Sequence, residues 1–146
     1  MSLFGSINIA GSGIAVDQTW LDSISSNIAN MNDAVNPANQ TYQDQQLVVA
    51  PTGTPPQDVL GLSNQTNNPI GTGVAITNVV TDLPNGQLAY QPNNPVANNQ
   101  GMVRIPGVNL ANQLGQLDIA ERSYQANAAV INHAKAAYQS VLALGA

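Results

Sequence analysis

The residues of this sequence that could carry out chemistry are few. The chain of 146 residues has one histidine, His133, and no cysteine. Asp118, Glu121 and Arg122 stand at helical spacing, but charges three and four residues apart usually lie on the solvent side of a helix. A lone histidine beside an apolar face is far more often a solvated or hydrogen-bonded residue than a general base. The sequence therefore predicts no catalytic residue.

The sequence also lacks the patterns that bind metals or cofactors. With one histidine and no cysteine, a zinc site would have to be built almost wholly from carboxylates, which is an unusual ligand set. The HExxH, GxSxG and GxxxxGK[ST] patterns of metalloproteases, hydrolases and nucleotide-binding loops do not occur. Gly71-Thr72-Gly73 precedes a strand pattern rather than a helix, so it does not fit a dinucleotide-binding loop. We predict a protein that is not an enzyme and that has no cofactor and no metal site.

Amides rather than charges carry the polarity of this chain. Charged residues make up 8% of it and the net charge is −5, whereas there are 19 Asn and 14 Gln. Because an amide costs less to bury than a charge once it is hydrogen-bonded, such a surface suits extensive protein–protein contact. The alternative that this composition leaves open is a partly disordered, amide-rich protein. The negative charge argues against nucleic acid and anionic membranes as partners.

Neither a membrane span nor a cleaved leader is predicted. No apolar run approaches the length of a transmembrane helix. The first cation is Arg104, so the N-terminus lacks the basic start of a secretory signal. If the protein leaves the cytoplasm, we expect it to be exported without a cleaved signal peptide.

A long C-terminal helix within 109–146 is the strongest structural prediction. Apolar residues recur there at alternating steps of four and three, which is the spacing of one helix face and of coiled coils. Asn109 is suited to cap the start, and Gly145 lies where a C-terminal cap glycine would. Glu121 and Lys135 interrupt the apolar face, either as edge residues whose heads reach water or as residues that set register. The predicted contact residues of this helix are Leu110, Leu114, Leu117, Tyr124, Ile131, Tyr138 and Leu142.

The first 31 residues form a second predicted helix with the same spacing, in which Asp17 is the one polar residue of the apolar face. Gly11-Ser12-Gly13 either breaks this helix in two or forms a small-residue patch where another helix approaches closely. Because two amphipathic helices lie at opposite ends of the sequence, we predict that they pair as a coiled-coil-like hairpin. The predicted contact residues of the N-terminal helix are Ile7, Ile14, Leu21, Ile24 and Ile28.

The length of the C-terminal helix predicts an elongated molecule. Residues 109–144 at roughly 1.5 Å per residue make a rod of about 54 Å. A compact globule of the same chain would have a diameter of about 40 Å. The apolar face therefore needs a long partner, which is either the N-terminal helix or a neighbouring subunit.

Residues 32–108 are predicted to form an insertion with a small β-hairpin. Strand-prone residues occur at 73–82 and at 87–91, and 83–86 is a short connection between them. We expect these two strands to pair. Because an isolated hairpin is marginally stable, a third strand near Val48 or a neighbouring subunit should support it.

The predicted fold class is mainly α with a small β insertion. A further β-prone run lies at 46–51, and 52–72 is predicted to be loop because proline, glycine and asparagine dominate it. The predicted domains are a discontinuous helical rod domain, 1–31 with 109–146, and an insertion lobe of loops and the β-hairpin, 32–108.

Three segments resemble bacterial flagellar axial proteins, the family of rod, hook and related components. The run Ser25-Ser26-Asn27-Ile28-Ala29-Asn30, followed by Tyr42, is similar to the family's N-terminal signature. Residues 90–97 (YQPNNPVA) and 101–108 (GMVRIPGV) resemble the YxPxNPxA…GYVxxPNV segment of the proximal-rod FlgC family. Residues 122–127 (RSYQAN) are similar to the run near the C-terminus of rod proteins. The motif residues that carry the resemblance are Asn27, Asn30, Tyr42, Tyr90, Pro92, Pro95, Pro106, Arg122, Ser123, Tyr124, Gln125 and Asn127.

The sequence departs from the family pattern at two positions. Met102 stands where the family usually has Tyr, and Gly107 where it has Asn. The spacer between Asn30 and Tyr42 is long and contains proline, which favours the proximal-rod family over other axial proteins. Residues 52–72 add nothing to the resemblance.

The resemblance implies a structural subunit of the bacterial flagellar basal-body rod, in its proximal part. Such a subunit self-assembles with other axial proteins into the helical drive shaft for motility. The implied partners are other rod proteins, copies of itself and the flagellar export apparatus, and the implied location is the periplasmic rod of the basal body. One alternative is another axial protein, such as a different rod or hook-junction component. An alternative from a different class is an acidic helical export chaperone or adaptor, which would be compact and soluble as a monomer or dimer.

Overall fold

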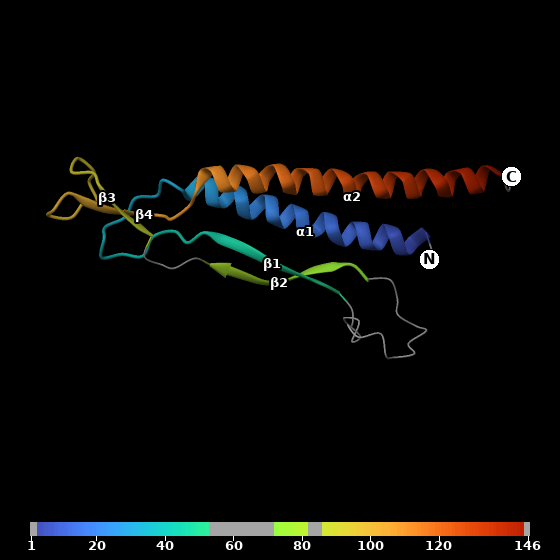
Figure 1. Cartoon of the computed structure of the whole chain (residues 1–146), viewed down its shortest axis with the longest axis horizontal. Helices are drawn as coiled ribbons and strands as arrows, with labels where there is room; N and C mark the ends of the chain where they lie inside the picture. Colours follow the sequence, from blue (N-terminus) through green and yellow to red (C-terminus); the bar gives the residue numbers. More distant parts are fainter. Residues whose placement is uncertain (1–2, 53–71, 82–85, 145–146) are drawn as a thin grey trace, which may run out of the picture. The chain divides into compact units, whose positions relative to one another are not determined.

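The computed structural model describes residues 3–52, 72–81 and 86–144 (Figure 1). Two long helices enclose four short strands in the sequence, which confirms the prediction of a mainly α fold with a small β insertion. The predicted loop at 52–72 and connection at 83–86 lie largely outside the described residues. The elements in chain order are α1 (Leu3–Asn30), β1 (Gln45–Pro51), β2 (Val74–Thr81), β3 (Gln87–Tyr90), β4 (Met102–Ile105) and α2 (Leu110–Leu144).

The chain divides into two compact units, and each helix runs through both. The first unit comprises Met1–Gln18, Val49–Thr77 and Glu121–Ala146, and the second comprises Thr19–Val48 and Asn78–Ala120. Each unit therefore contains part of α1, part of α2 and part of the segment between them. The predicted helical rod domain and insertion lobe stay a prediction, as does the elongated shape.

Helix α1 is continuous through Gly11-Ser12-Gly13. Ser12 accepts a hydrogen bond at its Oγ from the backbone N–H of Val74, at the start of β2, over 3.0 Å. Gly13 lies against α2, where a Cβ at this position would come within 2.6 Å of Nδ2 of Asn127. The small residues thus allow β2 and α2 to approach α1, and they do not break the helix. Of the two interpretations that the sequence left open, close approach is correct.

The strands pair differently from the prediction. β2 pairs with β1, and β3 pairs with β4 in a second two-stranded sheet. The predicted hairpin between 73–82 and 87–91 is therefore wrong. The physical reason is that residues 102–105 form a strand of their own, and they give β3 an antiparallel partner along its full length, from Gln87 opposite Ile105 onward. The expected strand near Val48 is present as β1.

In the second unit, β4 is joined to the segment that follows α1. Val35 and Arg104 exchange two backbone hydrogen bonds, each 2.9 Å long. The Nε and Nη2 atoms of Arg104 donate to the carbonyl of Pro37 over 3.1 and 2.8 Å. Val103, on the other face of β4, is fully buried, and so is Ile24 of α1. The strand pair is thereby fixed to the unit by backbone hydrogen bonds, by one guanidinium group and by a buried valine.

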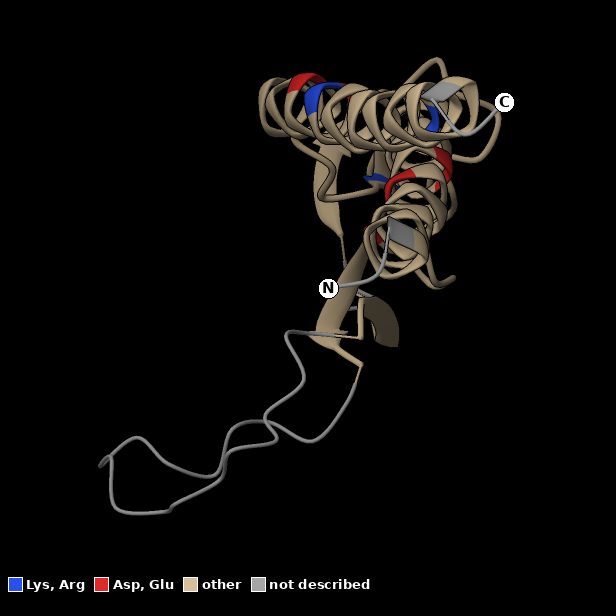
Figure 2. Ribbon diagram, turned by 90° about the vertical axis from the view of Figure 1, so that its right-hand side faces the viewer, with Lys and Arg blue, Asp and Glu red and all other residues tan. Residues whose placement is uncertain are grey.

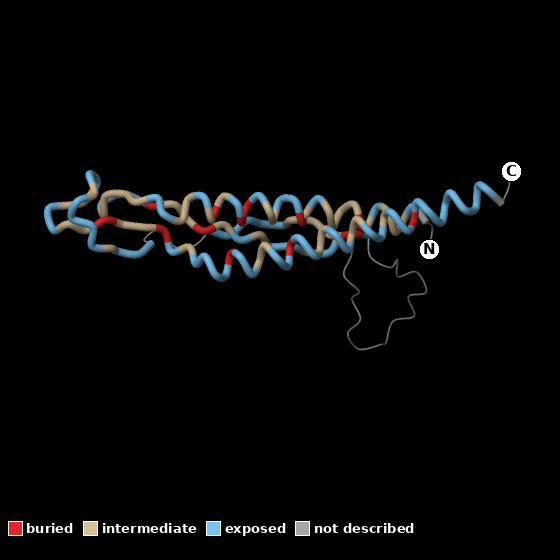
Figure 3. The backbone as a smooth tube through the Cα atoms, turned by 90° about the horizontal axis from the view of Figure 1, so that it is seen from above, coloured by how far each residue is buried: buried red, intermediate tan, exposed pale blue. Residues whose placement is uncertain are grey.

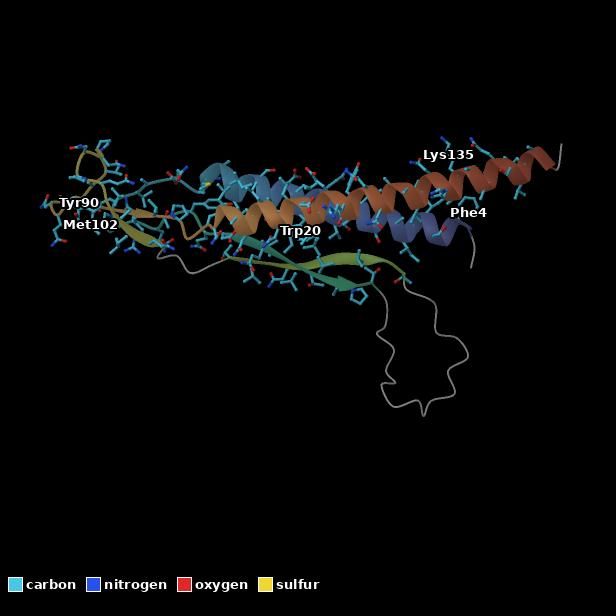
Figure 4. The ribbon with its side chains drawn as sticks, turned by 45° about the horizontal axis from the view of Figure 1, so that its top comes forward. Phe4, Trp20, Tyr90, Met102 and Lys135 are labelled. Carbon is cyan, nitrogen blue, oxygen red and sulfur yellow. The ribbon has the colours of Figure 1, made fainter. Side chains whose placement is uncertain are left out.

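In the first unit, α1 and α2 run in opposite directions. The rings of Phe4 and Tyr138 meet edge to face, with their centroids 6.2 Å apart (Figure 4 labels Phe4). Further along α1, Gly13 faces Asn127, which lies earlier in α2. Because residues later in α1 contact residues earlier in α2, the two segments are antiparallel. Whether this pairing has coiled-coil packing stays a prediction.

Candidate assembly interface

Asn27, a motif residue of α1, is the centre of a buried polar network in the second unit. Its side chain is 1% exposed. Its Oδ1 accepts a hydrogen bond from the N–H of Gln45 at the start of β1, and its Nδ2 donates to the carbonyl of the same residue, both over 3.0 Å. Oδ1 also accepts from the Tyr42 hydroxyl over 2.8 Å, and Nδ2 donates to Oε1 of Gln113 over 3.4 Å. One amide thus joins α1 to β1, to the preceding segment and to α2.

Gln113 of α2 extends the network. It is 2% exposed, and its Nε2 lies 3.1 and 3.3 Å from the two carboxylate oxygens of Asp44. Ser23 donates to the Gln45 carbonyl over 2.9 Å, beside Asn27. Among the described residues, every buried side-chain nitrogen or oxygen has a hydrogen-bond partner. Satisfied in this way, the polar groups hold the unit together instead of opposing its burial.

The helices of the second unit also run antiparallel. Trp20 of α1 lies with its Nε1 3.5 Å from Oε1 of Gln116, whereas Asn27, further along α1, meets Gln113, earlier in α2. Ala120, at the end of this part of α2, is fully buried. An indole–amide contact and an amide–amide contact therefore join the helices in this unit.

A second polar cluster joins the helices of the first unit. Asp17 of α1 is 5% exposed. Its Oδ2 accepts hydrogen bonds from Oγ of Ser123 over 3.1 Å and from Nδ2 of Asn127 over 3.0 Å. Gly13, one turn earlier in α1, leaves the space that the Asn127 amide fills. Two motif residues of α2 thus hold one buried carboxylate of α1.

The connection between β3 and β4 is a run of turns held by asparagine side chains. Oδ1 of Asn94 accepts from the N–H of Val96, and Oδ1 of Asn98 accepts from the N–H groups of Gln100 and Met102. Asn36, in the segment after α1, donates to the Val96 carbonyl over 3.2 Å. These bonds satisfy backbone groups inside the connection, so it has a defined shape without being part of a sheet.

The motif residues of this connection differ in exposure. Tyr90, at the end of β3, is 69% exposed, and Pro92 and Pro95 are exposed as well (Figure 4 labels Tyr90). Pro106, directly after β4, is buried. Gly101 has a φ of 73°, and a Cβ there would come within 2.8 Å of the Tyr90 ring. The tyrosine thus lies over a position that only glycine fits without strain.

Comparison with known proteins identifies the family. Residues 99–144 match the family described as "Flagellar basal body rod FlgEFG protein C-terminal". The chain is 33% identical to the flagellar basal-body rod protein FlgC of Borreliella burgdorferi, over 99% of this chain and 98% of that protein. It is 35% identical to FlgC of Buchnera aphidicola, over 99% and 98%, and 28% identical to FlgC of Bacillus subtilis, over 99% of each. The chain belongs to the FlgC family.

It is a structural subunit of the flagellar basal-body rod, found in the flagellar basal body, where it assembles with other rod components. The N-terminal and middle motif residues of this rod subunit have identifiable roles in the second unit. Asn27 and Tyr42 form its buried network, and Asn30 donates to the Ser26 carbonyl within α1 over 2.8 Å. The resemblance therefore rests partly on residues that hold the subunit together.

The predicted contact residues of the rod subunit divide into covered and uncovered ones. Ile24 is buried. Seven others are partly buried, namely Ile7, Ile14, Leu21, Ile28, Leu117, Tyr124 and Ile131. The remaining four, all on α2, are exposed: Leu110 by 40%, Leu114 by 50%, Tyr138 by 46% and Leu142 by 55%. The last turns of α2 are almost wholly exposed (Figure 3). That these residues contact other subunits stays a prediction.

Gln113 and Asn127 of α2 were not predicted to lie at a helix contact. Gln113, Ala120 and Ala134 are 2%, 0% and 8% exposed, and partly buried Asn127 lies between the two alanines. All four follow one another at intervals of seven residues, and this repeat is the signal that could have found the two amides. It lies beside the stripe of large apolar residues from which the contacts were predicted.

The two charged residues of the apolar face and two polar residues of the family motif lie on the surface. Glu121 and Lys135 are exposed, as are Arg122 and Gln125, and Figure 2 shows how few charges the helices carry. The exposure of Glu121 and Lys135 fits side chains at the edge of the contact, whereas a role in register between subunits stays a prediction.

The described residues that could carry out chemistry do not gather into a site. His133 is exposed on α2. Within residues 3–52, 72–81 and 86–144, no three histidine, cysteine or carboxylate side chains gather as metal ligands would. None of the described helices has the length and hydropathy needed to cross a membrane.

Proposed function

We propose that this chain is a proximal-rod subunit that packs with copies of itself and with other rod proteins into the helical drive shaft of the flagellum. In this proposal α1 and α2 pair as a coiled-coil-like hairpin, and the chain reaches the periplasmic rod through the flagellar export apparatus without a cleaved signal peptide. Packing of long helices side by side gives such a shaft resistance to bending and twisting. A head-to-tail contact that does not close into a ring produces a tube of this kind.

The observation that carries the proposal is the set of large apolar side chains that the isolated chain leaves uncovered on α2. In the second unit Leu110 and Leu114 are 40% and 50% exposed and stand one turn apart. In the first unit Tyr138, Val141 and Leu142 are 46%, 66% and 55% exposed. Grouped apolar exposure of this kind, in a chain with few charges, is typical of surfaces that other subunits cover.

The antiparallel contacts within each unit support the proposed helix pairing. They include hydrogen bonds between side chains of α1 and α2, such as those of Asp17 with Ser123 and of Asn27 with Gln113. These bonds leave the exposed leucines free for other partners. The intramolecular contact and the proposed intermolecular contact can therefore be disturbed separately.

The test replaces an uncovered side chain by a charge. Leu114→Asp and Leu142→Asp change exposed positions, so the folded subunit should keep its stability and should be exported normally. An unpaired carboxylate taken into a subunit contact costs several kcal/mol even after relaxation, and the contact recurs with every copy. We expect secreted subunit at wild-type level and no hook-basal bodies by electron microscopy.

The control is Glu121→Gln, which removes a charge from an exposed position of α2 and should leave rods intact. Normal rods in both leucine variants would mean that these side chains face solvent in the rod, and would overturn the proposed surface. If the flagellar export apparatus does not secrete the wild-type subunit, only the proposed export route is contradicted. Rods built normally in a strain that lacks the gene would overturn the proposed place of the chain in the drive shaft.

A further inference from the structure

The strand pair of β3 and β4 is closed along the outer edge of β4. Arg104 exchanges backbone hydrogen bonds with Val35 on that side. Met102, two residues earlier, donates its N–H to Oδ1 of Asn98 and accepts at its carbonyl from the N–H of the same residue. Both residues thus direct their backbone groups away from β3, and these groups already have partners. This side of the strand pair has no room for another strand.

The outer edge of β3 is open. Gln91, directly after β3, donates its N–H to the Gly101 carbonyl at the end of the strand pair. Because hydrogen-bonded residues alternate along an antiparallel pair, Ala89 also directs its N–H and C=O to β4. The backbone groups of Leu88 and Tyr90 therefore point away from β4. Within the ranges that the structure describes, β4 is the one strand that pairs with β3.

This open edge lacks the features that usually protect one. Natural sheets discourage edge-to-edge pairing with charges, prolines or bulges. The strand Gln87–Tyr90 has no charge and no proline, and its pairing runs without interruption to Tyr90 opposite Met102 (Figure 4 labels both). Leu88 and Tyr90 share one face of the strand and are 57% and 69% exposed. The edge therefore offers backbone groups and apolar side chains to a strand from outside.

We infer that the occupant of this edge is β3 of a second copy of the chain, running antiparallel, so that two free subunits pair through their second units. The run Gln87-Leu88-Ala89-Tyr90-Gln91 has the same order of polar, large, small, large and polar side chains in both directions. With Ala89 opposite Ala89 of the second copy, Leu88 lies opposite Tyr90, and Gln87 lies opposite Gln91. Such a pairing covers the exposed apolar side chains and brings no like charges together.

The backbone supports the same arrangement. The outward N–H and C=O groups of Leu88 and Tyr90 would form about four hydrogen bonds with their counterparts in the second copy. The two strand pairs would become one continuous antiparallel sheet, which is more stable than an isolated pair of strands. Ala89 would lie at the two-fold axis, where its small side chain lets the backbones approach closely.

The contact goes beyond the proposed function. It is two-fold and closes on itself, whereas the proposed shaft grows by a head-to-tail contact. It therefore joins free subunits and does not extend the rod. Pairing of so few residues buries less than the roughly 1,000 Å² of a stable interface, so the pair forms reversibly and in proportion to concentration.

The position of Ala89 allows a direct test, because the chain has no cysteine of its own. In the inferred pair the two Ala89 Cα atoms are about 4.5 Å apart, which lies within the roughly 4.4–6.8 Å that a disulfide spans. Ala89→Cys should therefore give a disulfide-linked dimer of the full chain under mild oxidation. The matched control is Gln87→Cys, at a more exposed position of the same strand. Its two copies would be about 14 Å apart and should remain monomeric.

A mixture of Gln87→Cys with Gln91→Cys should form the mixed dimer, because these two positions face each other in the inferred register. Leu88→Lys, added to Ala89→Cys, places a charge on the edge and should give roughly tenfold less dimer at equal concentration. Val96→Lys in the same background is its control, since Val96 is exposed but lies outside β3, and it should leave the yield unchanged.

Amide hydrogen exchange of the wild-type protein gives a second readout that needs no substitution. The N–H groups of Leu88 and Tyr90 should gain protection as the concentration rises, whereas the N–H of Ala89, directed to β4, should be protected at every concentration. Equal disulfide yields from Ala89→Cys and Gln87→Cys, or a yield that Leu88→Lys does not lower, would overturn the inference. Protection of the Leu88 and Tyr90 amides at every dilution would also overturn it, because the same chain would then cover the edge. Neither readout depends on rod assembly.

Discussion

Truncation of the buried Asn27 amide of α1 should strongly destabilise the second unit. Asn27→Ala removes four hydrogen bonds. The Gln45 carbonyl keeps Ser23 and the Tyr42 hydroxyl keeps Ser26, but the Gln45 N–H and Oε1 of Gln113 lose the partners described above. Each buried group left unsatisfied costs roughly 1–3 kcal/mol, so the free energy of unfolding should fall by about 4 kcal/mol. The better helix propensity of alanine returns less than about 1 kcal/mol.

The assay is urea denaturation followed by the fluorescence of Trp20, the one tryptophan of the chain, which lies in the second unit. A loss of about 4 kcal/mol is a large share of the roughly 5–15 kcal/mol that stabilise a domain. Asn30→Ala is the matched control, since it makes the same change three residues later and removes one bond to a carbonyl within α1. It should alter the free energy of unfolding by less than about 1 kcal/mol. Equal shifts in the two variants would refute the reasoning that Asn27 organises the unit.

Four further changes have definite expected outcomes. Gly101→Ala should lower the free energy of unfolding by about 1–2 kcal/mol in the same denaturation assay, because alanine is strained at a φ of 73° and its Cβ would meet the Tyr90 ring. Gly115→Ala should raise the free energy of unfolding by up to about 1 kcal/mol, because a Cβ at this helical position meets nothing within 4 Å. His133→Ala should leave motility intact, because the imidazole is exposed; a non-motile strain with normal export would contradict this. Ile131→Asp should be exported but build no rod, because it places a charge on the partly buried face of α2, and normal hook-basal bodies would show that this face meets solvent.

The helices could be predicted from the sequence because the signal for them is local. Apolar spacing along 3–30 and 110–144 depends on residues only three or four positions apart. Strand pairing is not local in this sense. The strand patterns at 73–82 and 87–91 were recognised, but proximity in the sequence favoured the wrong partner, since the partners of β2 and β3 are β1 and β4.

The buried amides could not be predicted from residue type. Gln113 is polar, and a polar residue beside an apolar stripe is normally assigned to the surface. It is buried because Asn27 and Asp44 approach from distant parts of the sequence and satisfy its amide. Asp17 was visible as the one polar residue on its face, but its donors Ser123 and Asn127 lie more than a hundred residues away in the chain. Such partners become apparent only in the folded unit.

The small apolar core explains why these polar contacts matter so much. Among the described residues, the buried hydrophobic side chains are Ala10, Ile24, Val103, Ala120 and Ala134. Full burial of an isoleucine or valine contributes roughly 1.5–3 kcal/mol, and an alanine contributes less. Disruption of the network around Asn27 costs about 4 kcal/mol, so its contribution to the free energy of unfolding is comparable to the largest apolar contributions in its unit. Several large apolar side chains of α2 are exposed within the described part of the chain, so hydrogen bonds contribute a large share of how α1 and α2 fit together within each unit.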